Sequence, residues 1–154
     1  MPAKSLQPGD KAPGFSLQAA SGTKVSLADL KGKTVVLYFY PKDMTPGCTQ
    51  EACDFRDLGA RFRKKGAVVL GVSKDPIDAH KKFIAKYSLP FELLSDEDGK
   101  ACKAYGAWRK KKLYGREFMG IVRSTFVIGP DGRIERVYDS VKVKGHAEAV
   151  LGAL

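Results

Sequence analysis

Two cysteines, Cys48 and Cys53, lie five positions apart at the end of a proline-rich segment. The chain has only three cysteines, which is too few, and an odd number, for the disulfide framework of a small secreted domain. In a reducing compartment, two cysteines this close together are candidates for catalysis or for metal binding. The segment that carries them is therefore where the chemistry of this chain is expected.

Metal binding is the less well supported of these two alternatives. The Cys-x4-Cys spacing begins a plant-type iron–sulfur pattern, but the next cysteine should follow two residues later, where the sequence has Arg56. For zinc, the remaining candidates Cys102, His80 and His146 are scattered singly, without the paired spacing of structural sites. We therefore expect no metal and no other cofactor.

The sequence around Cys48 places its thiol at the start of a helix. A β-branched and aromatic run over residues 34–40 predicts a buried strand, a loop containing Pro41 follows, and helical spacing begins at about Gly47. The positive end of the helix dipole and the unpaired N–H groups of the first turn both favour a thiolate. Because the thiolate is the nucleophilic form of cysteine, Cys48 is the candidate nucleophile.

The elements predicted around this segment alternate between strands and helices, after an irregular lead-in over residues 1–14. This order, ending in a hairpin and a helix, predicts a single α/β domain over residues 1–154, with a mixed central β-sheet flanked by helices. It suits the thioredoxin-like fold. The predicted strands cover residues 15–17, 24–26, 34–40, 67–72, 91–94, 123–128 and 133–138. One helical turn is predicted over 27–31, and helices over 47–65, 76–87 (capped by Asp75), 98–105 and 145–154.

The loop pattern Pro41-x-x-x-Thr45-x-x-Cys48 resembles the active-site pattern of the peroxiredoxins. The longer run Tyr-Pro-Lys-Asp-x-Thr-Pro-Gly-Cys-Thr-x-Glu-Ala-Cys, residues 40–53, is similar to the Q-type subfamily, also called bacterioferritin comigratory proteins. The similarity extends over nearly the whole chain and includes residues 8–13, 123–128 and 143–147. Met44 departs from the polar or small residues of that subfamily at this loop position.

The resemblance implies a thiol-dependent peroxidase that reduces hydrogen peroxide and organic hydroperoxides. Cys48 would be the peroxidatic cysteine, and Cys53 would capture its sulfenic acid as an intramolecular disulfide. Thr45 would hydrogen-bond peroxide and thiolate, Pro41 would shield the site, and Arg123 would supply a cation. Thioredoxin or a similar dithiol would then reduce the disulfide.

Breaking a peroxide bond requires more than a thiolate, because negative charge shifts onto the peroxide oxygens in the transition state. We expect the backbone N–H groups around Gly47 and Cys48 to act as donors. Glu51, in the first helical turn, either orients Arg123 or only complements the helix dipole. Cys102 is expected to be a buried helical residue, with an alternative resolving thiol as the second interpretation.

A disulfide between Cys48 and Cys53 conflicts with the predicted helix. Five helical residues advance about 7.5 Å and rotate about 500° around the axis. A disulfide usually requires Cα atoms within about 6.8 Å and side chains that face one another. The disulfide implied by the resemblance therefore predicts that the first helical turns unwind during the reaction.

The net charge of +10, from 27 Lys and Arg against 17 Asp and Glu, raises a rival function. The cluster of basic residues 109–112 lies between Trp108 and Tyr114, a pattern that superficially suits single-stranded nucleic acid. No known binding motif accompanies it, so we expect a solvated loop or helix face, and a basic nucleic-acid-binding protein is the alternative function. A thioredoxin-type oxidoreductase would need Cys-x-x-Cys, which the sequence lacks.

The longest apolar run, residues 35–40, is far shorter than a membrane span. The first ten residues contain no apolar signal segment, so a cytoplasmic protein without membrane association is expected. We also expect a monomer or a weak dimer.

Overall fold

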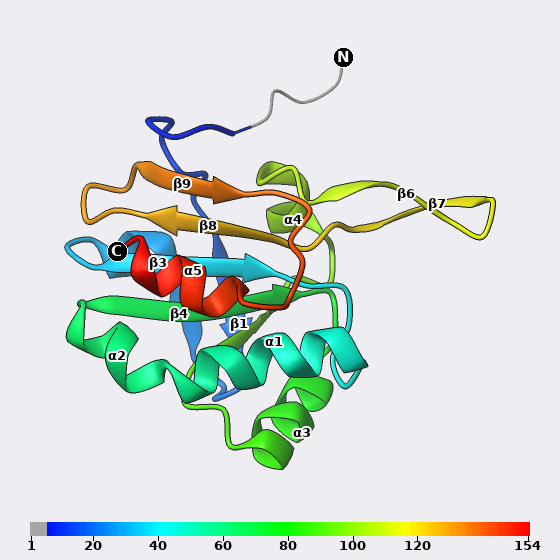
Figure 1. Ribbon diagram of the computed structural model, residues 1–154, viewed down its shortest axis with the longest axis horizontal. Coiled ribbons are helices and arrows are strands. Elements are labelled where there is room, and N and C mark those ends of the chain that lie inside the picture. The colour runs from blue at the N-terminus through cyan, green and yellow to red at the C-terminus, as the bar shows by residue number, and fades with distance from the viewer. Residues whose placement is uncertain (1–5) are drawn as a thin grey trace.

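The computed structural model describes residues 6–154; residues 1–5, which begin the predicted lead-in, lie outside the described part. Its centre is a seven-stranded sheet with the strand order β2-β1-β5-β4-β3-β8-β9 (Figure 1). The strands of this sheet are β1 (Ser16–Ala19), β2 (Lys24–Ser26), β3 (Thr34–Phe39), β4 (Ala67–Ser73), β5 (Glu92–Ser95), β8 (Ser124–Ile128) and β9 (Ile134–Tyr138). The helices are η1 (Leu27–Leu30), α1 (Pro46–Asp57), α2 (Gly59–Lys64), α3 (Ile77–Tyr87), α4 (Lys100–Ala104) and α5 (His146–Gly152).

The sheet is mixed. Strand β4 pairs in parallel with both β3 and β5, whereas β8 pairs antiparallel with β3 and with β9. Antiparallel pairing of β1 with β5 and β2 completes the other edge. This is the predicted α/β class with a mixed central sheet, and the prediction is confirmed.

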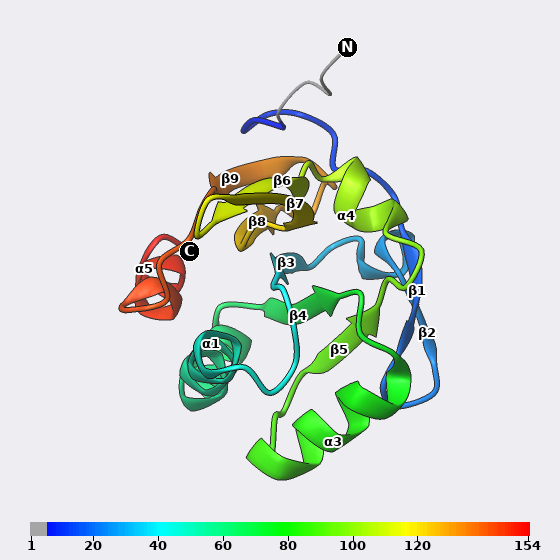
Figure 2. The ribbon, with the colours of Figure 1, turned by 90° about the vertical axis from the view of Figure 1, so that its right-hand side faces the viewer.

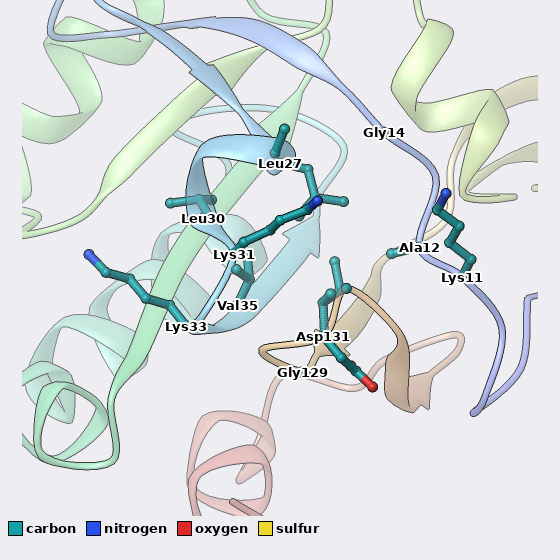
Figure 3. A pocket seen from close by; sticks show the side chains of 13 residues that line it. Lys11, Ala12, Gly14, Leu27, Leu30, Lys31, Lys33, Val35, Gly129 and Asp131 are labelled. Carbon is teal, nitrogen blue, oxygen red and sulfur yellow. The ribbon is translucent and has the colours of Figure 1, made fainter.

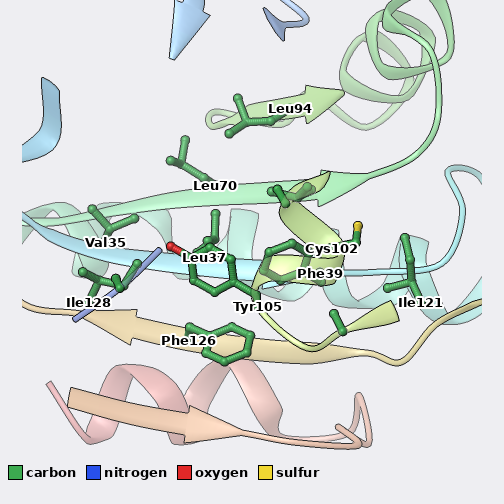
Figure 4. Close-up of a cluster of buried hydrophobic side chains, with 14 of the residues drawn as sticks. Val35, Leu37, Phe39, Leu70, Leu94, Cys102, Tyr105, Ile121, Phe126 and Ile128 are labelled. Atoms are coloured by element: carbon green, nitrogen blue, oxygen red, sulfur yellow. The ribbon is translucent and has the colours of Figure 1, made fainter. Parts of the chain in front are cut away.

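Alternate residues of β3 face two separate cores. Val35, Leu37 and Phe39 point to the core that also contains α4 and η1 (Figure 4). Val36 and Tyr38 point to the other core, which buries side chains of α1, α2, α3 and α5. Figure 2 shows α1 and α5 on one side of the sheet and α4 on the other. Because side chains alternate across a strand, one apolar run supplies both cores.

The predicted helix over residues 47–65 is divided into α1 and α2 at Leu58. Leu58 has φ −97° and ψ 5°, outside regular helical geometry, and the buried Gly59 follows it. Glycine has a low helix propensity, which favours a break at this point. The apolar spacing continues through the break because α1 and α2 cover the same core, so the sequence pattern predicts one helix. The prediction of a continuous helix was wrong at this point.

The basic cluster 109–112 is neither a loop nor a helix. It forms strand β6 (Trp108–Leu113), which pairs antiparallel with β7 (Arg116–Ile121) in a two-stranded sheet of its own. Tyr114 and Gly115 have φ 51° and 75°, the left-handed pair that a type I′ hairpin turn requires. The sequence did not predict this strand, because strands are recognised by alternating apolar residues and this one contains three consecutive lysines.

None of the helices within residues 6–154 combines the length and the apolar composition required to cross a lipid bilayer.

Candidate active site

The loop between β3 and α1 holds Cys48 at the third residue of the helix. Thr45 is the N-cap residue in extended conformation, and Pro46 follows at the first helical position, where its fixed φ fits and its missing N–H is no loss. The first helical bond runs from the Thr49 N–H to the Thr45 carbonyl at 2.8 Å. The amides of Gly47 and Cys48 therefore precede the helical ladder and can serve a ligand.

A half-buried cation lies against the Cys48 thiol. Arg123, just before β8, donates from Nη2 to Cys48 Sγ at 3.3 Å and from Nη1 to Glu51 Oε1 at 2.6 Å. The Cys48 residue is 2% exposed, and the side chains of Glu51 and Arg123 are 1% and 16% exposed. A Cβ at position 47 would lie 3.2 Å from Arg123 Nη2, so Gly47 makes room for the guanidinium.

Pairing of β3 with β8 brings Arg123 to this place. Phe39, near the end of β3, lies opposite Ser124, the first residue of β8. Arg123, the residue before Ser124, therefore lies at the same end of the sheet as the loop that follows β3 and leads to Cys48. Of the two interpretations of Glu51, the ion pair with Arg123 is the one that the structure contains.

Burial raises the pKa of Glu51 to about 7, although Arg123 lowers it. For Arg123, burial lowers the pKa, but Glu51 and Cys48 raise it by more, so the guanidinium stays charged. A carboxyl whose folded-state pKa lies above its ordinary value of 4.5 costs stability when ionised. This cost is fully present above about pH 7 and absent below about pH 4.5.

Thr45 and Pro41 lie in the loop that leads to Cys48, and both are half-buried. The Thr45 hydroxyl donates to the Lys42 carbonyl at 2.7 Å. That hydrogen is therefore used within the loop, and the hydroxyl oxygen keeps lone pairs with which to accept a hydrogen bond. Met44 has φ 66°, a left-handed conformation that favours Gly, Asn or Asp, which explains why a polar or small residue suits this position.

A buried polar network, which sequence reasoning missed, anchors the loop. Asp43 accepts from the Tyr40 hydroxyl at 2.5 Å and lies 2.7 Å from His80 Nδ1. His80 Nε2 lies 3.0 Å from the Leu94 carbonyl. Asp75, predicted to cap α3, instead accepts from the Asp43 N–H at 2.9 Å, and α3 begins one residue later than predicted. A lone histidine and a loop aspartate 37 positions apart give no signal in a sequence.

We expect Asp43→Ala to lower the free energy of unfolding by roughly 3 kcal/mol, because removing one partner of a buried hydrogen-bonded pair leaves the other partner unsatisfied. Urea denaturation measures this change. Asp29→Ala, at an exposed acidic residue of η1, is the matched control and should change stability by less than about 0.5 kcal/mol. Equal stability of the two variants would show that the pair does not anchor the loop.

The three cysteines are all free thiols, and the sheet separates one of them from the other two. Cys48 packs in the core covered by α1, whereas the fully buried Cys102 packs in the opposite core, where Figure 4 shows it beside Phe39 and Tyr105. Burial, and then Asp96, raise the pKa of the Cys102 thiol. Cys53 is half-buried on α1, five residues beyond Cys48. The expectation that Cys102 is a buried helical residue is confirmed.

Within residues 6–154, no three His, Cys, Asp or Glu side chains are grouped so that they could hold a metal ion. A cavity of about 510 Å³ lies at the other end of β3 from Cys48 (Figure 3). Leu27, Leu30 and Val35 contribute apolar side chains to it, and Lys11, Lys31 and Lys33 contribute cationic ones. It contains none of the predicted site residues.

Comparison with known proteins agrees with the geometry around Cys48. Residues 8–137 match the AhpC/TSA family. Peroxiredoxin Bcp of Bacillus subtilis is 49% identical over 150 residues, which cover 97% of this chain and 96% of that protein. The chain belongs to the peroxiredoxin family, in its Bcp or Q-type branch.

Solved structures support the same assignment. A cysteine-to-serine mutant of Xylella fastidiosa PrxQ superposes on this peroxiredoxin with a TM-score of 0.92 at 40% identity, covering 98% of this chain and 96% of that one. The bacterioferritin comigratory protein of Xanthomonas campestris gives a TM-score of 0.87 at 44% identity, covering 90% and 88%. The predicted family and thioredoxin-like fold are confirmed.

Peroxiredoxins are thiol peroxidases, so this chain is an oxidoreductase that acts on peroxides through a thiol. Nothing in these relatives supports the alternative of a basic nucleic-acid-binding protein. Of the residues predicted for the peroxiredoxin site, the structure brings Cys48, Gly47, Glu51 and Arg123 into one cluster, with Thr45 and Pro41 in the adjoining loop.

Proposed function

We propose that this peroxiredoxin reduces hydrogen peroxide and organic hydroperoxides through Cys48, with Cys53 as the resolving cysteine and a thioredoxin-like dithiol as the reductant. The observation that carries the proposal is the half-buried Arg123 guanidinium, which donates both to the buried Glu51 carboxylate and to the Cys48 sulfur. The activity named for the Xanthomonas campestris relative, alkyl peroxide reduction, supports the inclusion of organic hydroperoxides.

In the first step the Cys48 thiolate attacks the terminal oxygen of the hydroperoxide. A sulfur–oxygen bond forms, the oxygen–oxygen bond breaks, and an alkoxide or hydroxide leaves and takes up a proton. Arg123 Nη2, which lies 3.3 Å from Sγ, and the amides of Gly47 and Cys48 would stabilise the charge that develops on the oxygens. The Thr45 hydroxyl oxygen would accept the hydrogen bond of the peroxide O–H.

In the second step Cys53 attacks the sulfenic acid sulfur, a disulfide forms, and water leaves. Both cysteines lie within the uninterrupted α1, so the helical geometry forbids this bond until the first turns unwind. α1 ends at Asp57 and the helical geometry is broken at Leu58, so unwinding of α1 need not extend into α2. Cys102 would need to cross the sheet to reach Cys48, which favours Cys53 as the partner.

Intact-protein mass spectrometry after one equivalent of hydroperoxide, with no reductant present, tests the proposal. Wild type and Cys102→Ser should each lose two hydrogens, the signature of a disulfide. Cys53→Ser should instead gain one oxygen, and more at higher peroxide, because its sulfenic acid is not captured and oxidises further. A disulfide that survives in Cys53→Ser but is lost in Cys102→Ser would assign resolution to Cys102.

A further inference from the structure

The β6–β7 hairpin gathers most of the exposed large apolar side chains of the described residues. Four of the five belong to it, Leu113, Tyr114, Phe118 and Met119, and the fifth is Met44 in the loop before Cys48. Tyr114, at the turn, is 95% exposed. The hairpin pairs with no strand of the main sheet, and Figure 1 shows that it projects from the body of the molecule. Apolar side chains grouped in this way mark interaction sites.

The hairpin is also strongly basic. Between Trp108 and Ile121 it has five basic residues and one acidic residue. Arg109 pairs with Asp139 and Lys110 with Glu117, but neither Lys112 nor Arg116 forms an ion pair with any residue in 6–154. A surface with uncompensated positive charge and exposed apolar groups suits an acidic partner. A second copy of this chain would bring the same positive charge and is disfavoured.

One face of the hairpin leads from the tip to the active site. The strand register places Leu113 opposite Arg116 and Lys111 opposite Phe118, and these two pairs share a face because alternate pairs do. We call this set of four residues the Lys111 face. Lys111 Nζ donates to the Ile121 carbonyl at 2.9 Å, two residues before Arg123. Arg123 in turn donates to Cys48 Sγ at 3.3 Å, so the base of this face lies close to the reacting thiol. Burial and then Arg123 lower the pKa of Lys111, whereas Cys48 raises it.

We propose that the Lys111 face is the docking surface for the reductant, an acidic protein that carries an accessible dithiol. The inference rests on the proposed function, because it requires the Cys48–Cys53 disulfide. A thiolate of the docked partner attacks this disulfide and forms a mixed disulfide, which the partner's second thiol then breaks. The partner is oxidised to a disulfide, and both cysteines return to thiols. Nucleic acid and anionic membranes match the charge of the hairpin, but neither requires its position beside Cys48.

Steady-state peroxidase assays with two reductants test the docking surface. The probes are an acidic thioredoxin-fold protein with a Cys-x-x-Cys motif and the small molecule dithiothreitol. With the protein probe, Arg116→Glu should lower kcat/KM about threefold or more, and Leu113→Ser/Phe118→Ser about tenfold. The rate with dithiothreitol and the rate of Cys48 oxidation should both stay at the wild-type value.

Matched control variants separate the face from the rest of the surface. Lys82→Glu reverses an exposed charge on α3, and Met119→Ser removes an exposed apolar side chain from the opposite face of the hairpin; both should keep the wild-type kcat/KM. The wild-type kcat/KM for the protein probe should fall with added salt, and less steeply in Arg116→Glu.

Unchanged kinetics of the protein probe in both face variants would overturn the docking surface. Loss of binding to single-stranded DNA or to anionic lipid vesicles in those variants, with reductant kinetics unchanged, would assign the face to that ligand instead. A wild-type protein that forms no disulfide with peroxide alone would overturn the proposed function itself. The intact mass detects this without any hairpin variant, so the two failures are distinguishable.

Discussion

Cys48→Ser is expected to abolish hydroperoxide consumption, with a loss of roughly 100-fold or more. A hydroxyl at this position is not ionised at neutral pH, so the nucleophile disappears while Arg123 keeps an oxygen to which it can donate. The substitution shortens one buried side chain slightly and leaves the Arg123–Glu51 ion pair in place. Peroxide consumption with excess dithiothreitol measures the effect, and circular dichroism checks the fold.

Cys53→Ser is the matched control for this variant, because it changes the same atom on the same helix. It should still consume one equivalent of peroxide in a single turnover, whereas Cys48→Ser should consume none. Residual turnover of Cys48→Ser above about 1% of wild type would assign the nucleophile to another residue.

Arg123→Ala is expected to slow sulfenic acid formation roughly 100-fold, the usual cost of removing one donor from a developing anion. Arg123→Lys should recover only part of this rate, because an ammonium group cannot contact Glu51 and Cys48 with the planar fork of a guanidinium. Stopped-flow fluorescence or quenched-flow mass spectrometry at several peroxide concentrations gives the rate. If both variants react as fast as wild type, another group supplies the cation.

A companion variant separates the charge of Glu51 from the shape of its side chain. Because burial raises the pKa of Glu51 to about 7, the wild-type carboxyl is largely ionised above that pH and neutral well below it. Glu51→Gln is always neutral, so its oxidation rate should differ from wild type at pH 8 and converge with it near pH 5.5. A difference that is the same at both pH values would mean that the amide disturbs the position of Arg123 instead.

The parts of the site that lie close together in the sequence could be predicted from it. Pro41, Thr45, Gly47 and Cys48 belong to one loop and one helical turn, whose conformation follows from local rules for proline, caps and helix starts. Arg123 is different, because its position depends on the pairing of β3 with β8 across more than 80 residues. The resemblance to a known family supplied that residue, and local patterns in the sequence did not.

Two features resisted prediction for separate physical reasons. The Asp43–His80 pair depends on the packing of α3 against the loop, and side-chain pairs of this kind leave no periodic signal. The β6–β7 hairpin has little buried apolar surface, so neither of its strands shows the alternation that indicates a sheet. The only other indication of a hairpin in this segment is its turn at Tyr114-Gly115, where Gly115 favours a turn and Tyr114 does not.

The Arg123 guanidinium binds Cys48 and Glu51, which are three residues apart and therefore span one turn of α1. The contacts that prepare the thiol for peroxide are thus the same contacts that hold this turn in its helical form. Both contacts are lost when the turn unwinds for resolution. Stronger contacts between Arg123 and these two side chains therefore raise the free energy required to unwind the helix. A change that speeds sulfenic acid formation at Cys48 is then expected to slow disulfide formation with Cys53. In a variant that reacts faster with peroxide for this reason, Cys48 would remain a sulfenic acid for longer and would be more easily inactivated by overoxidation.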